Sequence, residues 1–244
     1  MLLRAQKIGK SFDGFTAVRG VDLEVAKGEI VGLIGPNGAG KSTFFNCLAG
    51  DMAPSAGRVL FDGTDLTRAS AETHSRAGIG RTFQVPATFE DMTIVENVMV
   101  GAFLRRAHRH EAREHALRII EMTGLAAQAS HRARSLGTPG RKRLEIARVL
   151  ATGPRLMLLD EALAGLTPAE LQDAIALVRR IHELGITLVI VEHIMEVIMT
   201  LAQRVLVFNQ GEVIAHGKPD EIVRNEAVIE AYLGRGHRSR RMTP

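Results

Sequence analysis

The sequence has no tryptophan, one tyrosine and one cysteine among its 244 residues. The lone Cys47 excludes a disulfide bond within the chain and is typical of a protein from a reducing compartment. Because Tyr232 is the single tyrosine, few rings are present from which to build a platform that stacks nucleic-acid bases. No apolar run is long enough to cross a bilayer and no secretory signal opens the sequence, so we expect a cytoplasmic protein.

A strong excess of one charge sign is also absent, with 31 Lys and Arg against 27 Asp and Glu. Much of the difference lies in a basic tail over residues 235–244, which contains four arginines. Such a tail offers a contact for anionic lipid or nucleic acid, although a solvated chain end is the simpler interpretation. The 45% share of hydrophobic residues is that of a globular protein, and the length fits one large α/β domain or two small ones.

A glycine-rich turn at residues 35–42 lies between a strand pattern at 28–34 and a helix pattern at 43–49. Glycines allow a phosphate group to approach the backbone closely, and the N–H groups of a helix N-terminus point at such an anion. In this arrangement Lys41 reaches the β- and γ-phosphates, and the Ser42 hydroxyl binds Mg²⁺. We therefore predict that the chain binds a nucleoside triphosphate through Gly35, Pro36, Asn37, Gly38, Ala39, Gly40, Lys41, Ser42 and Thr43.

An acidic pair, Asp160 and Glu161, follows the apolar strand pattern at 156–159. An Asp at the end of a strand can hold Mg²⁺, and the Glu beside it is placed to polarise an attacking water. Surface acids are common, so this pair alone is weak evidence. In a chain that already has a phosphate-binding turn, it predicts nucleotide hydrolysis with Asp160 as a metal ligand and Glu161 as the catalytic base.

Two further polar residues follow strand patterns. Gln84 comes after the strand-like segment 78–83, and its amide can accept a bond toward the metal and donate one toward water. His193 comes directly after the strand pattern at 187–192, where an imidazole can hydrogen-bond a γ-phosphate and stabilise developing charge. Each would be an ordinary surface residue in another context, so both assignments depend on the motifs above.

The strand and helix patterns alternate along most of the chain, which predicts an α/β sheet with its ligand at the carboxyl ends of the strands. Residues 92–150 differ, because they have apolar residues at helical spacing and little strand signal. This segment is predicted to be a helical insert.

The motifs together resemble the ATP-binding subunit of ABC transporters over nearly the whole chain, in the order of the turn, Gln84, Asp160-Glu161 and His193. The resemblance implies a RecA-like P-loop core with an antiparallel β subdomain, at about 1–91 and 151–234, and an inserted helical subdomain at about 92–150. Phe12 resembles the aromatic residue that stacks on adenine in this family, and a core phenylalanine is the alternative.

A narrower resemblance, to importers of branched-chain amino acids, rests on the segments 78–84, 89–98, 191–195 and 209–217. Importers of amides and urea are similar, so the solute stays open. Import rather than export follows from the resemblance alone, because the solute is selected largely by the permease and a binding protein.

The chain departs from the family at its Leu-Ser-Gly-Gly-Gln signature, which is replaced by the stretch Leu136–Gly140. In the family this stretch contacts ATP held by the opposite subunit, a role that the resemblance assigns here to Gly137, Thr138 and Gly140. Gly137 lacks the serine hydroxyl, and Pro139 lacks a backbone N–H. Whether this signature supports full ATPase activity stays open. Two smaller departures are Ala162 in place of Pro and Thr167 in place of Asp or Asn.

The resemblance implies a Mg-ATP-dependent ATPase that pairs with a second cassette, as a homodimer or a heterodimer. It also implies separate membrane permease subunits docked near Gln84 and residues 85–100, an indirect solute-binding partner, and a peripheral position on the inner face of the plasma membrane. A soluble ABC ATPase acting on DNA or ribosomes is the alternative, but no second cassette or aromatic-basic pattern supports it and no nucleic-acid partner is expected. A GTPase is disfavoured because no Asn/Thr-Lys-x-Asp motif is present.

Overall fold

The computed structural model describes residues 1–233, so the predicted basic tail at 235–244 lies outside the described residues. The chain divides into two compact units, which are described separately below. Within the described residues, the first comprises 1–71 with 189–233, and the second comprises Glu72–Leu188.

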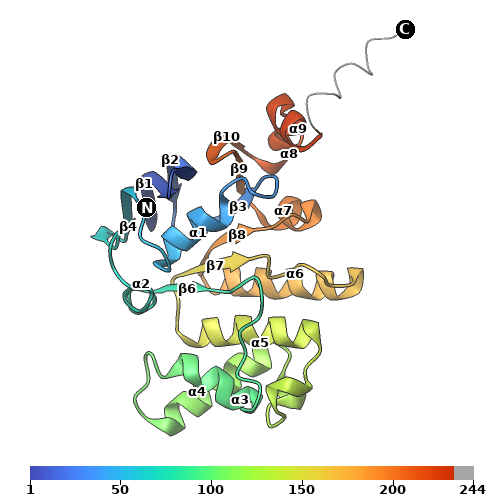
Figure 1. Cartoon of the computed structure of the whole chain (residues 1–244). Helices are drawn as coiled ribbons and strands as arrows, with labels where there is room; N and C mark the ends of the chain where they lie inside the picture. Colours follow the sequence, from blue (N-terminus) through green and yellow to red (C-terminus); the bar gives the residue numbers. More distant parts are fainter. Residues whose placement is uncertain (234–244) are drawn as a thin grey trace. The chain divides into compact units, whose positions relative to one another are not determined.

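The first unit contains a four-stranded antiparallel sheet with the strand order β2-β1-β4-β5 (Figure 1). Its strands are β1 (Leu3–Phe12), β2 (Phe15–Val25), β4 (Ala56–Phe61) and β5 (Thr64–Asp65). Buried and exposed residues alternate over much of β1 and β2, as expected where one face of an antiparallel sheet is covered and the other meets water. This sheet is the antiparallel β part that the sequence resemblance implied.

A second sheet begins in the same unit with the order β10-β9-β3 and continues to β8 (Thr187–Val191), the strand at which the two units divide. β3 (Ile30–Ile34) runs parallel to β9 (Arg204–Asn209), and β10 (Glu212–Gly217) is antiparallel to β9. All five residues of β3 are buried, as is typical of a parallel strand covered on both faces. The helices of this unit are α1 (Lys41–Ala49), α7 (Met195–Leu201), α8 (Pro219–Ile222) and α9 (Glu226–Leu233).

The second unit joins strands β6 and β7, which are parallel, to a set of packed helices. Its elements are α2 (Ala71–Ala77), β6 (Ile79–Arg81), α3 (Ile94–Ala102), α4 (Arg109–Met122), η1 (Ala126–Gln128), η2 (Ala133–Ser135), α5 (Thr138–Ala151), β7 (Leu156–Asp160) and α6 (Pro168–Glu183). Helices α3, α4 and α5 share one buried apolar cluster, in which Ala112, Ala116 and Ala147 provide small contact surfaces between helices. α6 begins at a capping box, in which the Thr167 hydroxyl accepts from the Glu170 N–H.

Within residues 1–233, none of the helices combines the length and the apolar character that a membrane span requires.

Candidate functional site

The predicted phosphate-binding turn connects β3 to α1 in the first unit. Its glycines at 35 and 40 have φ angles of 149° and 99°. A Cβ atom on Gly35 would lie 2.2 Å from the Phe208 carbonyl oxygen, and one on Gly40 would lie 2.4 Å from the Ala17 carbonyl oxygen. Both positions therefore require glycine, because the backbone of Phe208 and of Ala17 occupies the space that a side chain would need.

The turn ends at the N-terminus of α1, which has the properties of an anion site. Gly40 is the N-cap, no side chain caps this helix end, and its first turn contains no acidic residue. The dipole of the helix and its first N–H groups favour a negative charge at such a position. Asn37, Gly38 and Ser42 are exposed on the same segment, so an anion can reach it from solvent.

Lys41 folds back over the turn that precedes it. Its buried side chain donates from Nζ to the carbonyl oxygens of Gly35, at 2.7 Å, and Pro36, at 2.9 Å. These bonds place a positive charge inside the turn. The arrangement supplies both backbone donors and a cation for a bound phosphate group.

Two other predicted residues of this unit, His193 and Phe12, are exposed. His193 lies two residues beyond the end of β8, with the buried Glu192 between them. Phe12 ends β1 with 41% of its surface exposed, which is not the burial of a core phenylalanine, and the Lys10 ammonium lies 5.2 Å from its ring centroid. Phe15 pairs with Phe12 across the hairpin and is 65% exposed.

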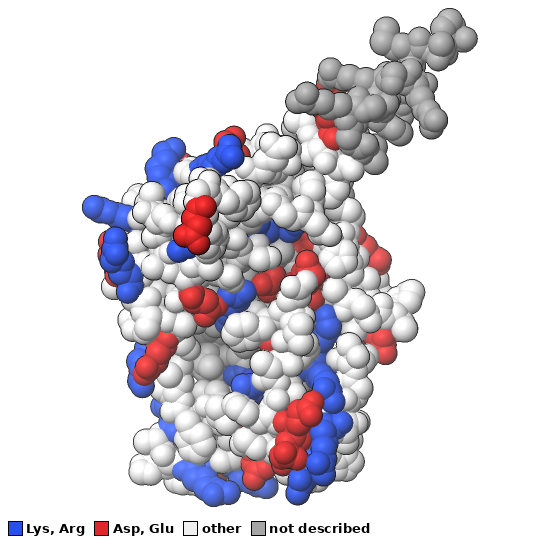
Figure 2. All heavy atoms as spheres, in the orientation of Figure 1, with Lys and Arg blue, Asp and Glu red and all other residues white. Residues whose placement is uncertain are grey.

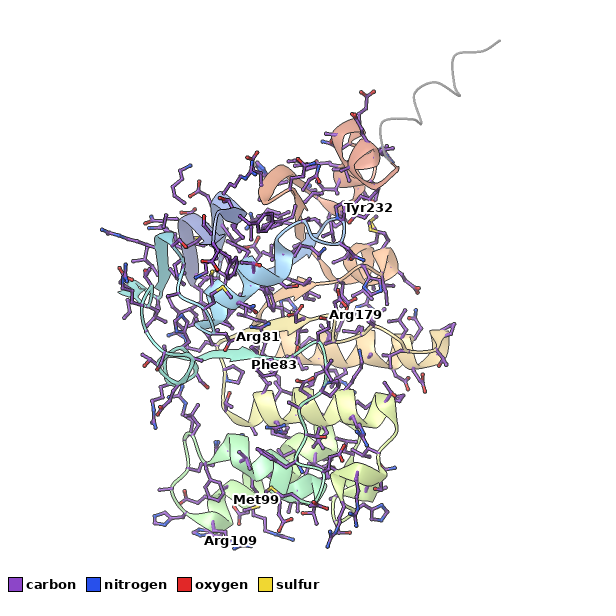
Figure 3. All side chains as sticks on the ribbon, in the orientation of Figure 1. Arg81, Phe83, Met99, Arg109, Arg179 and Tyr232 are labelled. Carbon is purple, nitrogen blue, oxygen red and sulfur yellow. The ribbon has the colours of Figure 1, made fainter. Side chains whose placement is uncertain are left out.

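In the second unit, Asp160 ends β7 and is buried against an arginine. Its Oδ2 accepts from Arg81 at 2.9 Å, and the two side chains are only 6% and 12% exposed. The Arg81 guanidinium also lies 5.2 Å from the ring centroid of Phe83, and Figure 3 labels both residues near β6. Sequence reasoning did not predict Arg81 as a partner of this carboxylate.

Glu161 is the next residue and is held at two points. Its Oε2 accepts from Gln84 Nε2 at 2.9 Å, and its carbonyl oxygen accepts from the buried Lys142 Nζ at 3.1 Å. Its φ of 47° is unusual for a residue with a side chain and costs on the order of 1 kcal/mol. The structure thus brings together Gln84 and Glu161, both predicted site residues, and adds Lys142.

Helix α5 also holds the segment that carries Gln84. The Glu145 carboxylate accepts from the Phe83 N–H at 2.8 Å, and Arg148 donates to the Ala87 carbonyl. Burial raises the pKa of Glu145 to about 7, and the hydrogen bond from Phe83 is the largest of the opposing effects. The Arg148 guanidinium lies 4.6 Å from the centroid of the Phe89 ring. Two side chains of one helix turn therefore hold residues 83–89.

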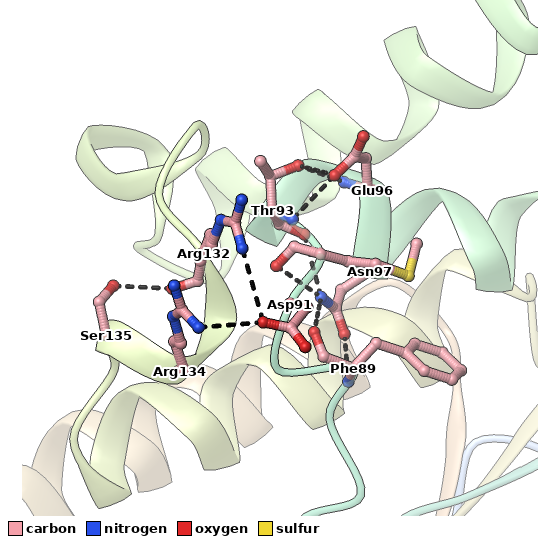
Figure 4. Close-up of polar contacts among 9 residues, drawn as sticks. Phe89, Asp91, Thr93, Glu96, Asn97, Arg132, Arg134 and Ser135 are labelled. Carbon is pink, nitrogen blue, oxygen red and sulfur yellow. Dashed lines mark hydrogen bonds and ion pairs between the residues drawn. The ribbon is translucent and has the colours of Figure 1, made fainter.

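The following segment, predicted to contact membrane subunits, is ordered by its own polar contacts (Figure 4). The buried Asn97 side chain accepts from the Phe89 N–H at 2.9 Å and donates to the Phe89 carbonyl at 2.9 Å. Thr93 and Glu96 form a capping box at the start of α3. Phe89 keeps 44% of its surface exposed, so its ring is presented on a rigid segment.

The altered signature lies at the start of α5. Gly137 is the N-cap without a side-chain cap, and Pro139 occupies the first helical turn, where a missing N–H is tolerated. Gly137 and Thr138 are exposed, whereas Gly140 is half-buried. A Cβ atom on Gly137 would have only the Pro139 Cδ nearby, at 3.9 Å, so a serine fits there.

Because of this space, we expect Gly137→Ser to raise ATP turnover by about three- to tenfold in the assembled complex. The new hydroxyl would cap α5 and add a donor for a partner subunit's γ-phosphate, and hydrogen bonds to charged groups contribute more than neutral ones. Steady-state ATPase assays measure the effect, with Gly137→Ala as the control that adds the Cβ atom alone. Equal turnover of the Ser and Ala variants would show that the missing hydroxyl has no effect.

Comparison with known protein families gives this geometry its context. The family model described as ABC transporter matches residues 18–164, which is more than half of the chain. The chain belongs to the ABC transporter family. A second model, described as branched-chain amino acid ATP-binding cassette transporter, matches residues 212–238 of this cassette.

Curated relatives of the cassette match nearly all of its length. The high-affinity branched-chain amino acid transport ATP-binding protein BraF of Pseudomonas aeruginosa is 38% identical, covering 96% of this chain and 98% of the relative. The protein LivG of Escherichia coli strain K12, described in the same words, is 39% identical with the same coverage.

Solved ABC cassettes have the same fold. A nucleotide-free ATP-binding cassette from an ABC transporter superposes with a TM-score of 0.87 at 30% identity, covering 96% of this chain and 99% of the other. The ADP conformation of MJ1267 gives 0.87 at 31% identity over 96% and 98%. A dimeric post-hydrolysis state of MJ0796, bound to ADP and Pi, gives 0.81 at 26% identity over 89% and 99%. The predicted ABC ATPase fold is confirmed.

Proposed function

We propose that this ABC ATPase powers the import of branched-chain amino acids, or of a related amino acid or amide, through separate membrane subunits. The observation that carries the proposal is the 38–39% identity to BraF and LivG over 96% of the chain. The match of residues 212–238 to a model of branched-chain amino acid cassettes supports the same solute class.

The chemistry of the predicted site residues, each taken within its own unit, supports the binding of ATP with Mg²⁺. Residues 35–43 would bind the phosphates, Phe12 would stack on adenine, and His193 would bond the γ-phosphate. The exposed Ser42 hydroxyl, the Gln84 amide and the buried Asp160 carboxylate are oxygen ligands of the kind that Mg²⁺ prefers. Bound Mg²⁺ would neutralise charge on the phosphate oxygens.

Glu161 would act as the catalytic base toward the attacking water. Its carboxylate is oriented by the Gln84 amide at 2.9 Å, and its backbone is oriented by Lys142 at 3.1 Å. These two contacts fix the orientation of the Glu161 side chain and backbone. A general base must be positioned within hydrogen-bond reach of the proton that it takes.

A second cassette is the partner that the signature needs, because Gly137, Thr138 and Gly140 would contact ATP on the opposite subunit. The dimeric state of MJ0796 supports pairing of this kind. Residues 85–100 would receive the permease at the inner face of the plasma membrane, and a solute-binding protein would act through that permease.

Residues 92–150 would form the helical subdomain within the single ABC domain. Figure 2 shows basic and acidic side chains interspersed on the visible face of the described residues, which offers nucleic acid no continuous basic track there.

We expect Lys41→Ala to weaken ATP binding by about 10- to 100-fold, because it removes a charge-assisted bond to phosphate. Calorimetric titration with ATP in the presence of Mg²⁺ measures this effect. Lys27→Ala, which removes an exposed charge from the same unit, is the control and should bind like the parent. Equal affinity of both variants would contradict the assignment of the phosphate-binding turn.

The transport function is tested by reconstituting the cassette with its permease and binding protein in liposomes. ATP inside the liposomes should drive uptake of labelled leucine, isoleucine or valine, and Lys41→Ala should stop it. ATP hydrolysis without uptake of any of the three would exclude branched-chain amino acids and leave a related amino acid or amide as the solute.

A further inference from the structure

Arg141, at the end of the first turn of α5, folds back over the altered signature that precedes it. Its Nε donates to the Leu136 carbonyl oxygen at 3.0 Å, and its Nη1 donates to the Glu90 carboxylate at 2.8 Å. Its backbone N–H donates to the Gly137 carbonyl oxygen at 3.0 Å, which is the first hydrogen bond of the helix. One residue therefore bonds two successive carbonyl groups of the signature.

The Leu136 side chain fixes the same turn from the other side. It is 6% exposed and belongs to the buried cluster shared by α3, α4 and α5. A Cβ atom on Gly140 would lie 3.0 Å from the Leu136 Cδ2, so this side chain packs directly against Gly140. Because Arg141 holds the Leu136 carbonyl and the core holds its side chain, the turn into α5 has little freedom to change its path.

Glu90, the acidic partner of Arg141, lies on a segment that is bonded to the chain entering the signature. The Glu90 carbonyl oxygen accepts from the Arg134 N–H at 3.1 Å. The next residue, Asp91, pairs with the Arg134 side chain at 3.1 Å and with Arg132 at 3.5 Å (Figure 4). These contacts fix the position of Glu90, so the Arg141 guanidinium is oriented from outside its own helix.

The exposure of the pair indicates what it contributes. The Arg141 side chain is 35% exposed and that of Glu90 is 57% exposed. An ion pair with this much solvent around it adds little to global stability. The guanidinium nevertheless donates in two fixed directions at once, to a carboxylate and to a carbonyl, which a lysine ammonium on its flexible stem does less well. The effect of Arg141 should therefore be on local geometry rather than on folding.

We propose that Arg141, oriented by Glu90, is a positioning residue for the altered signature. It holds Gly137, Thr138 and Gly140 in the orientation in which they contact ATP on the opposite subunit, and the inference rests on that proposed role. The N-cap of α5 has no side-chain hydrogen bond, so the guanidinium supplies a restraint that a capping side chain would otherwise provide.

The test compares Arg141→Met with Arg132→Met in the assembled complex. Arg141→Met should lower kcat for ATP hydrolysis by about tenfold, the effect of losing a hydrogen bond to a charged group. The affinity of the isolated chain for ATP, measured by calorimetric titration, should change less than twofold, because the phosphate-binding turn belongs to the other unit.

Arg132→Met is the matched control, because it removes a 56% exposed arginine from the same set of ion pairs without touching the signature. It should hydrolyse ATP with the parental kcat. An unchanged kcat in Arg141→Met, an equal loss in both variants, or a loss of ATP affinity as large as the loss of kcat overturns the proposal.

Glu90→Ala tests the pair from its exposed side and decides the matter if Arg141→Met does not fold. It should lower kcat by about three- to fivefold, and combining it with Arg141→Met should cause no further loss, because both changes remove the same contact. A parental kcat in Glu90→Ala, or losses that add in the double variant, contradicts the proposal. Failure of the proposed function looks different, because the parental complex itself would then hydrolyse no ATP.

Discussion

Replacing Glu161 with Gln lowers the rate of ATP hydrolysis by at least about 100-fold, the usual contribution of a general base, while ATP still binds. The amide has the shape of the carboxylate and still accepts the bond from Gln84, but it takes no proton from water. ATPase assays measure the rate, and light scattering with and without Mg-ATP measures the mass. An ATP-dependent dimer would show that the signature at 136–140 closes on a second copy of this chain.

Glu183→Gln is the matched control, since this residue is exposed at the end of α6. It should hydrolyse ATP at the parental rate. A Glu161→Gln variant that is equally active would remove Glu161 from the role of base. If Glu161→Gln binds ATP and stays monomeric, the pairing requires a different cassette or the membrane subunits.

The second large effect is on stability. Arg81→Met should lower the free energy of unfolding by about 3–5 kcal/mol, because it leaves the Asp160 carboxylate buried without its arginine. For a chain of this size the melting temperature should fall by about 10 °C. Differential scanning calorimetry without nucleotide measures the shift.

Arg76→Met provides the comparison, because Arg76 pairs with Glu72 at 3.0 Å on the surface, with the side chains 63% and 70% exposed. Exposed pairs contribute up to about 1 kcal/mol, so this variant should melt within about 3 °C of the parent. Similar losses in both variants would mean that burial does not strengthen the Arg81–Asp160 contact. The double variant with Asp160→Asn should recover part of the loss, since no charge is then left buried.

The sequence predicted most of the elements that form the site, and their lengths less well. The expected strand at 78–83 is the shorter β6, Ile79–Arg81, and the strand pattern at 187–192 is β8, Thr187–Val191. These ends depend on pairing with neighbouring strands rather than on local apolar runs. The start of α6 at Pro168 is by contrast a local feature, because Thr167 and Pro168 are start signals that the sequence itself contains.

The phosphate-binding turn was determined by the sequence itself, because its glycines, Lys41 and Ser42 are contiguous and their backbone requirements are local. Only the tertiary structure decided the partners of the other site residues. Arg81 and Asp160 are 79 positions apart, and Gln84 and Glu161 are 77 apart. Contacts of this range arise from strand pairing and helix packing, which no local pattern encodes.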